Sequence, residues 1–211
     1  MTGQSLPYTI RPMNPGDVPV VAAIDRLSFP TPWLASSYLY ELNHNAQSCY
    51  YSLLKPATDV TVHPGRGWRH WLRGVLGSSK ESLVIGYVGV RFQTGKAHIS
   101  TIAVHPDWRG NGLGELLLLT AVERVLELGG STVSLEVRPS NQVAHNLYRK
   151  YGFRFIQVHR GYYRDGEDAW LMEAKVGLDA YRARLTGMRR LLEERLHCQR
   201  TDVGQNDRDT I

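Results

Sequence analysis

The glycine-rich segment Arg109–Gly114 (RGNGLG) constrains the fold of this chain more than any other feature of its sequence. It follows the β-rich run 97–104 and leads into the run 112–128, whose apolar residues recur at helical spacing. Glycines let a backbone adopt positive φ and come close to a ligand, and a helix start presents unpaired N–H groups at the positive end of its dipole. The segment therefore predicts a strand–turn–helix unit that can hold a pyrophosphate. A turn that merely starts a helix is the weaker interpretation.

The glycine spacing argues against two common phosphate loops. In the G-x-G-x-x-G fingerprint of dinucleotide folds, the third glycine would fall on Glu115 when read from Gly110 and on Leu117 when read from Gly112. Glu136 does end the next strand near the acidic ribose-binding position of that fold, but the glycine loop lies in the middle of the chain. No Gly-Lys-Ser/Thr follows, so a Walker loop is excluded as well.

The composition is that of one soluble globular domain. With 211 residues, 42% of them hydrophobic and 21% charged, the chain can bury the core of a single α/β domain. Its first residues lack the apolar core of a signal peptide, and no apolar run approaches the roughly 20 residues that span a bilayer. The two cysteines have no redox or metal spacing, so we expect a reducing, cytoplasmic location without membrane contact. The eight histidines also lack metal-binding spacing, so no metal is expected.

The hydrophobic pattern predicts an α/β fold around one mixed sheet. The predicted strands are 8–12, 49–54, 82–92, 97–104, 131–137, 153–159 and 168–176. The predicted helices are one that follows the turn 14–17, then 33–42, 112–128, 141–151 and 178–197. Residues 55–82 are rich in Pro, Gly and Ser and predict a long loop or hairpin insertion, whereas the polar tail 198–211 predicts disorder.

Four motifs in order resemble those of the GNAT acetyltransferases, and more narrowly the RimI-like branch, which acetylates the N-terminal alanine of a small-subunit ribosomal protein. They are FPTPW (29–33), STIAVHPDWRGNGLGELLL (100–118), LEVRPSNQVAHNLYRKYGF (135–153) and GYYRDGEDAWLM (161–172). The resemblance implies an acetyltransferase domain over 1–176, with a central twisted mixed sheet of about seven strands flanked by helices. The 55–82 insertion, between the second and third strands, and the C-terminal helix 177–197 lie outside the resemblance.

The resemblance also implies acetyl-CoA as co-substrate and assigns two catalytic residues. Glu136 matches the general base, acting through water, and Tyr148 matches the general acid beside the thioester sulfur. From the residues alone, Glu136 reads as a surface or salt-bridged glutamate and Tyr148 as a helix position packed in the core. No Ser-His-Asp or Cys-His grouping calls for a covalent intermediate.

The matched motifs further imply which residues bind the donor. The strand residues at 102–104 would pair with the pantetheine amides, with an N–H near Val104 polarising the thioester carbonyl. Asn141 both caps its helix and matches the asparagine that contacts the pantetheine arm. The full set of implied donor residues is Ile102, Ala103, Val104, Arg109, Gly110, Asn111, Gly112, Leu113, Gly114, Glu115 and Asn141.

The expected acceptor is a protein or peptide N-terminus. In relatives, tyrosines at the positions of Tyr162 and Tyr163 close over the incoming peptide, and Phe29 and Trp33 would line the opposite wall. An ordinary aromatic hairpin explains the two tyrosines about as well.

Two other functions stay open. One is a GNAT enzyme that acts on lysine side chains or small-molecule amines, and the other is a non-catalytic acetyl-CoA-binding or RNA-associated module, which intact Glu136 and Tyr148 disfavour. The net charge of +5 fits anionic partners without specifying one. The insertion carries basic and aromatic side chains that suit weak ribosome or RNA contact, although a solvated loop is the commoner form of such segments. They are Arg66, Trp68, Arg69, His70, Trp71 and Arg73.

Overall fold

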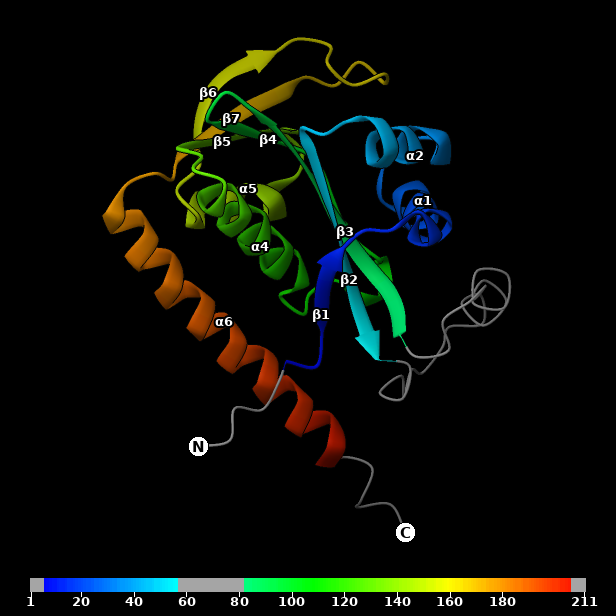
Figure 1. Cartoon of the computed structure of the whole chain (residues 1–211), viewed down its shortest axis with the longest axis vertical. Coiled ribbons are helices and arrows are strands. Elements are labelled where there is room, and N and C mark those ends of the chain that lie inside the picture. The colour runs from blue at the N-terminus through cyan, green and yellow to red at the C-terminus, as the bar shows by residue number, and fades with distance from the viewer. Residues whose placement is uncertain (1–5, 57–81, 206–211) are drawn as a thin grey trace.

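The computed structural model describes residues 6–56 and 82–205 and shows one seven-stranded mixed sheet (Figure 1). Its order is β1-β2-β3-β4-β5-β7-β6, and every neighbouring pair is antiparallel except β4 and β5, which are parallel. The strands are β1 (Thr9–Pro12), β2 (Ser48–Pro56), β3 (Ser82–Gln93), β4 (Lys96–Val104), β5 (Thr132–Val137), β6 (Arg154–His159) and β7 (Ala169–Lys175). The predicted mixed sheet of about seven strands is confirmed.

Helices cover both faces of this sheet. In Figure 1, α1 and α2 lie on one side, and α4, α5 and α6 lie on the other. The helices are α1 (Val18–Ser28), α2 (Ala35–His44), α4 (Leu113–Glu127), α5 (Gln142–Lys150) and α6 (Asp179–Gln205), with short 3-10 turns η1 (Pro15–Asp17) and η3 (Pro106–Trp108). Each face has its own apolar core, so the sheet is buried between two helical layers.

The tight turn between β3 and β4 fixes the register of the central strands. Thr94 and Gly95 both have positive φ, 48° and 74°, and join the facing pair Gln93 and Lys96. Two central residues of positive φ match the right-handed twist of a hairpin, which is why a glycine stands there. The turn therefore sets which β4 residues reach the glycine loop at its far end.

Helix α4 is buried on more than the one face that its sequence predicts. The predicted apolar face, which includes Leu113, Leu117 and Val125, is at most 1% exposed, but Leu118 and Leu119 are also fully buried. A helix that is apolar on nearly all sides is a buried helix. The second contact comes from α6, which packs along α4 on the side away from the sheet (Figure 1).

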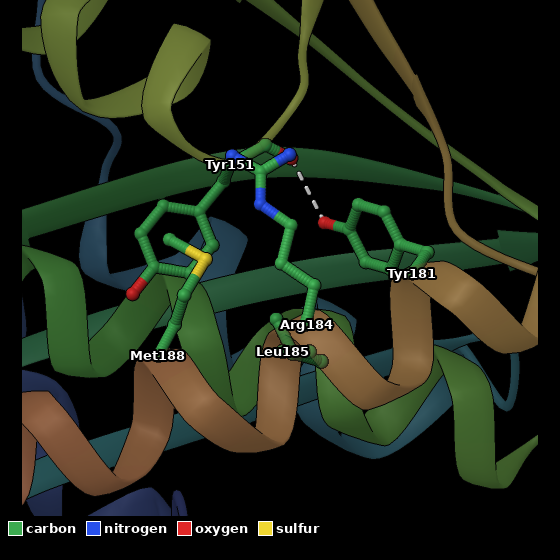
Figure 2. Close-up of a pocket in the computed structure, with 5 residues that line it drawn as sticks. All are labelled: Tyr151, Tyr181, Arg184, Leu185 and Met188. Carbon is green, nitrogen blue, oxygen red and sulfur yellow. Dashed lines mark hydrogen bonds between the residues drawn. The ribbon is translucent and has the colours of Figure 1, made fainter.

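Helix α6 is anchored to the end of α5. The Tyr181 hydroxyl donates to the carbonyl oxygen of Tyr151 at 2.9 Å, and Arg184 Nη2 donates to that of Lys150 at 2.6 Å. Figure 2 shows Tyr151, Tyr181 and Arg184 together with the α6 residues around them. Further along α6, buried leucines join the core that α4 shares with the sheet; they are Leu185, Leu192 and Leu196.

Two boundaries differ from the sequence analysis. Helix α6 ends at Gln205 instead of 197, so the first part of the tail 198–211, predicted to be disordered, is helical. A formed helix propagates at little cost without an apolar face, and residues 198–205 contain no Pro and one Gly, Gly204, in the last turn. The insertion 55–82 does fall between β2 and β3, but β2 reaches Pro56 and β3 starts at Ser82. The rest of the insertion, with its basic-aromatic cluster, lies outside the described residues, as does 206–211.

No helix in the part of the chain that the structure describes is both long and apolar enough to cross a membrane.

Replacing Leu192 by alanine should lower the free energy of unfolding by about 2–4 kcal/mol, because it removes a buried side chain from the core. Its neighbour Leu191 is 61% exposed, and the same replacement there should change the free energy by about 0.5 kcal/mol or less. Urea titrations of the two variants beside the wild type measure the difference. Equally small losses would contradict the packing of α6 against the domain.

Candidate active site

The parallel strands β4 and β5 separate soon after they meet. They pair over four positions only, from Lys96 opposite Thr132 to Ile99 opposite Leu135. Beyond that point β4 stays paired with β3, and β5 with β7. The register of β3 and β4 shifts so that Ser100 is an extra residue, and such a bulge bends its strand. The facing edges of β4 and β5 are therefore unpaired beyond Ile99 and Leu135, and the space between these two diverging edges is called the slot below. The predicted donor residues Ile102, Ala103 and Val104 lie along its β4 edge.

At the end of this slot the chain forms the glycine loop and then α4. Gly110 and Gly112 have φ values of 82° and 76°, in the left-handed region that favours glycine. Gly112 is the N-cap of α4, and no side chain caps the helix there. Within the described residues, the backbone N–H groups of Leu113, Gly114 and Glu115 have no hydrogen-bond acceptor. An uncapped start of a 15-residue helix is suited to bind an anion.

The three glycines of the loop face different surroundings. A Cβ atom built on Gly110 or Gly114 would meet no other atom within 4 Å. A Cβ on Gly112 would lie 3.2 Å from Arg195 Nη2 and 3.3 Å from a methyl group of Leu192, both on α6. The open side of the cradle is thus at Gly110 and Gly114, and the α-carbon of Gly112 faces α6.

The side chains of Arg109 and Asn111 hold the loop in shape. Arg109 Nε donates to the carbonyl oxygen of Val104 at 3.0 Å, and its Nη2 donates to Ser28 Oγ at 2.9 Å. Asn111 Nδ2 donates to the carbonyl oxygen of Trp108 at 3.1 Å. These bonds tie the loop to β4, α1 and η3.

Glu136 lies on β5 just past its last pair with β4, between two histidines. Its Oε2 is 2.9 Å from His98 Nε2, and its Oε1 is 3.8 Å from His159 Nδ1. Its side chain is 14% exposed. Burial favours the neutral acid, but the His98 hydrogen bond and the charge of both histidines outweigh burial, so the pKa of the Glu136 carboxyl is lowered. The carboxyl is therefore ionised near neutral pH and paired with an imidazole.

Sequence reasoning missed both histidines. His98 stands opposite Ser134 in the parallel register, and Ser134 lies two residues before Glu136 on the same face. Period-two alternation could have grouped the three side chains, but only once the pairing of β4 with β5 was known. His159 comes from β6 and meets Glu136 across the intervening strand β7.

Tyr148 lies on the opposite face of the sheet from Glu136. It belongs to the core formed with α4, whereas Glu136 alternates with the core residues Leu135 and Val137 and so points the other way. The Tyr148 side chain is 6% exposed, and burial raises the pKa of its phenol far above the ordinary value. The phenol is therefore protonated, and none of the described residues forms a hydrogen bond with its hydroxyl.

Tyr163 connects the two sides of the slot. Its phenol interacts electrostatically with Glu136 and with Tyr148, and burial is the largest cause that raises its pKa to about 12. Neighbouring Tyr162 is 51% exposed and also interacts with Glu136, which together with burial, the larger cause, raises the pKa of the Tyr162 phenol. Both predicted acceptor tyrosines therefore lie beside the predicted base.

Arg138, at the end of β5, holds this tyrosine hairpin in place. Its guanidinium lies 3.8 Å from the ring centroid of Tyr163 and forms ion pairs of 2.9 Å with Asp165 and 2.5 Å with Glu167. Glu167 in turn accepts a 2.7 Å hydrogen bond from Ser140 Oγ, next to the N-cap of α5. Asn141 is that N-cap and accepts from the N–H of Ala144 at 3.1 Å.

A buried carboxylate fixes the segment that carries Phe29 and Trp33. Asp25 of α1 is 1% exposed and accepts from the N–H of Trp33 at 2.5 Å, from the Tyr38 hydroxyl at 2.9 Å, and from the Tyr87 hydroxyl. Phe29 is half-buried, and Trp33 is 38% exposed. The α1–α2 segment is thereby tied to β3. In Figure 1, α2 and the β6–β7 hairpin lie toward the same end of the molecule.

The described residues contain no group of three or more His, Cys, Asp or Glu side chains placed to hold a metal ion.

Residues 39–153 match the family model described as the acetyltransferase (GNAT) family. A Bacillus subtilis protein provisionally named ribosomal protein bS18 alanine N-acetyltransferase is 33% identical over 164 residues, which are 77% of this chain and 92% of that protein. An N-alpha-acetyltransferase from Sulfurisphaera tokodaii is 40% identical over 104 residues, 43% of this chain and 62% of that protein.

The fold agrees with these matches. The crystal structure of the ribosomal-protein-S18-alanine N-acetyltransferase from Escherichia coli superposes with a TM-score of 0.61 at 25% identity, over 81% of this chain and 95% of that one. As its motifs predicted, the chain belongs to the acetyltransferase (GNAT) family and is an N-acetyltransferase.

Proposed function

We propose that this N-acetyltransferase transfers the acetyl group of acetyl-CoA to the N-terminal α-amine of a protein, with the N-terminal alanine of a ribosomal protein as acceptor. The observation that carries the proposal is the slot between β4 and β5. It has an ionised carboxylate, Glu136, on one face and a protonated phenol, Tyr148, on the other. The names of the bS18-alanine N-acetyltransferases among its relatives support the acceptor.

The donor fits the cradle at the end of the slot. Acetyl-CoA, when bound, supplies the acetyl group as a thioester. Its pyrophosphate would lie in the open space at Gly110 and Gly114, against the unpaired N–H groups at the start of α4. The free edge of β4 at Ile102, Ala103 and Val104 would pair with the pantetheine amides as a further strand would. Asn141, on the α5 side of the slot, would contact the same arm.

The first chemical task is to remove a proton from the acceptor. A peptide α-amine has an ordinary pKa of about 8 and is mostly protonated near neutral pH. Glu136 would take this proton, directly or through one water, on the face that Tyr162 and Tyr163 border. His98, 2.9 Å from the carboxylate, would hold that carboxylate in position.

The chain then assists bond exchange at the carbonyl carbon. The amine nitrogen forms the new C–N bond while the C–S bond breaks. A backbone N–H near Val104 would stabilise the negative charge that develops on the carbonyl oxygen. The Tyr148 hydroxyl would give a proton to the departing sulfur, and the proton that the nitrogen loses as the amide forms would restore the phenol by way of solvent. The products are then an acetylated N-terminus and a free thiol.

The acceptor end of the site favours a chain terminus over a lysine side chain. Tyr162 and Tyr163 lie beside Glu136, and Arg138 holds their hairpin through two ion pairs. A peptide end could enter between this hairpin and the fixed α1–α2 segment with Phe29 and Trp33. A ribosomal acceptor would place the activity in the cytoplasm. The basic and aromatic side chains of the insertion would then suit weak contact with ribosome or RNA. We further propose that residues 1–176 form the catalytic domain.

Replacing Gly114 by valine should abolish the rise in melting temperature that acetyl-CoA gives the wild-type protein, since the added methyl groups would fill the open cradle. The unliganded variant should melt at or above the wild-type temperature, because Gly114 lies in a helix and its Cβ position is free. Gly114→Ala is the control, since it adds only one methyl group at an open position, and it should keep the shift. Scanning fluorimetry with and without acetyl-CoA gives the result. An undiminished shift in Gly114→Val would place the donor elsewhere.

Glu136→Gln should lower kcat by about 10²-fold or more and leave the Kd for acetyl-CoA nearly unchanged, because the side chain serves the amine. In the wild type, kcat/KM should rise with pH up to about 8 as the α-amine loses its proton, because the lowered pKa keeps Glu136 charged throughout that range. Glu127→Gln, on a side chain 63% exposed at the end of α4, is the matched control. Wild-type turnover in Glu136→Gln would remove this residue from the mechanism.

A peptide that begins with alanine should gain one acetyl group at its first residue. The same peptide with a blocked N-terminus and an internal lysine should gain none, because the proposed acceptor is the α-amine. Mass spectrometry of both peptides after incubation with acetyl-CoA decides the point. Acetylation of the blocked peptide would support lysine as acceptor and reject the terminal amine.

A further inference from the structure

Helix α6 brings a positive charge to the first turn of α4. Glu115, in that turn, is 8% exposed and has three partners. Its Oε1 accepts from Lys150 Nζ at 2.5 Å and from the Tyr151 hydroxyl at 2.8 Å, and its Oε2 accepts from Arg195 Nη2 at 2.6 Å. One carboxylate therefore joins three segments of the chain: the start of α4, the end of α5 and the second half of α6.

The cluster has more positive than negative charge. Glu115 is ionised, because the hydrogen bonds from Lys150 and Arg195 outweigh burial and lower its pKa. One carboxylate then balances only one of two cations. The side chains of Lys150 and Arg195 are each 47% exposed, so the surplus charge faces solvent rather than the core.

This surplus charge lies against the glycine loop. Arg195 Nη2 would be 3.2 Å from a Cβ on Gly112, and Glu115 is one of the residues whose backbone N–H has no acceptor among the described residues. Contacts before and after Arg195 in the sequence hold this part of α6 against the domain. Arg189 pairs with Glu123 of α4, and Leu192 and Leu196 are 1% exposed. Closer to its start, Tyr181 and Arg184 bind the end of α5 (Figure 2).

We propose that Arg195, together with Lys150, forms a phosphate subsite through which α6 binds the nucleotide end of the donor. The subsite rests on the proposed function, because its ligand is the phosphate-bearing part of acetyl-CoA. In the proposed binding mode the pantetheine arm would lie in the slot between β4 and β5, so the phosphates beyond the glycine loop would be the part of the donor nearest this cluster. Glu115 holds the two cations at the loop, and their unbalanced charge faces the phosphate.

Arg195→Gln should weaken acetyl-CoA binding about 10-fold at low salt, and the difference from wild type should shrink as salt screens the charge. Acetyl-pantetheine, which has no pyrophosphate or nucleotide phosphate, should bind both proteins equally. Arg190→Gln removes the same charge from the same helix, at a side chain 77% exposed that pairs with Glu194, and should change neither Kd. Calorimetric titrations of the three proteins with both ligands give these values.

A second variant and a third ligand separate the possible outcomes. Lys150→Gln should weaken acetyl-CoA binding without affecting acetyl-pantetheine binding. Arg195→Lys should recover part of the affinity for acetyl-CoA that Arg195→Gln loses. The third ligand is 3′-dephospho-acetyl-CoA, which keeps the pyrophosphate and lacks the 3′-phosphate. If Arg195→Gln still binds it more weakly than the wild type does, the subsite binds the pyrophosphate; if the two proteins bind it equally, the subsite binds the 3′-phosphate. An equal loss for acetyl-CoA and acetyl-pantetheine would reduce Arg195 to a packing role, and tighter binding in Arg195→Gln would mean that α6 covers the donor site. Failure of the wild type to bind acetyl-CoA at all would reject the proposed function itself, independently of the subsite.

Discussion

The separation of β4 from β5 is the constraint on which the rest of the site depends. Two parallel strands in the middle of a sheet normally pair along their length, and unpaired backbone in that position is costly unless a ligand or water satisfies it. Here the pairing stops at Ile99 and Leu135, where the bulge at Ser100 turns β4 away. The sheet stays together on each side of the opening, since β4 remains paired with β3 and β5 remains paired with β7. The sheet is thereby opened at its centre without the loss of its two cores.

The two faces of the sheet carry different groups at this opening. On the side of α4 and α5, the uncapped helix start and Tyr148 are suited to a phosphate-bearing donor and its sulfur. On the side of α1 and α2, Glu136 and the tyrosine hairpin are suited to an amine. The two reactants would approach from opposite sides and meet where the strands diverge, which is consistent with direct transfer and requires no nucleophile from the chain.

Most of the fold and part of the candidate site could be predicted from local patterns in the sequence. All seven strands and the five long helices follow from apolar periodicity and from glycine and proline positions, because both depend on neighbouring residues. The glycine loop was recognisable for the same reason, and family resemblance supplied the roles of Glu136 and Tyr148, which periodicity alone would have placed at a surface and in a core. His98 and His159 were missed because strand pairing brings them to Glu136. The approach of Arg195 to Gly112 joins residues 83 positions apart, and neither helix period nor composition shows it.

The buried carboxylate of Asp25 has a consequence for how this enzyme can diverge. The α1–α2 segment, proposed above as one wall of the acceptor site, is held through its backbone, at the N–H of Trp33, and through two tyrosine hydroxyls behind it. The exposed indole of Trp33 and the half-buried ring of Phe29 take no part in those bonds. The Trp33 ring packs against Tyr38 with centroids 5.5 Å apart, and Phe29 packs against the core, so exchange of the more exposed Trp33 is the change that would reshape this surface while its backbone bond to Asp25 is kept. If this segment borders the acceptor as proposed, the fixed backbone lets acceptor preference change through an exposed side chain, separately from the hydrogen bonds that hold the fold.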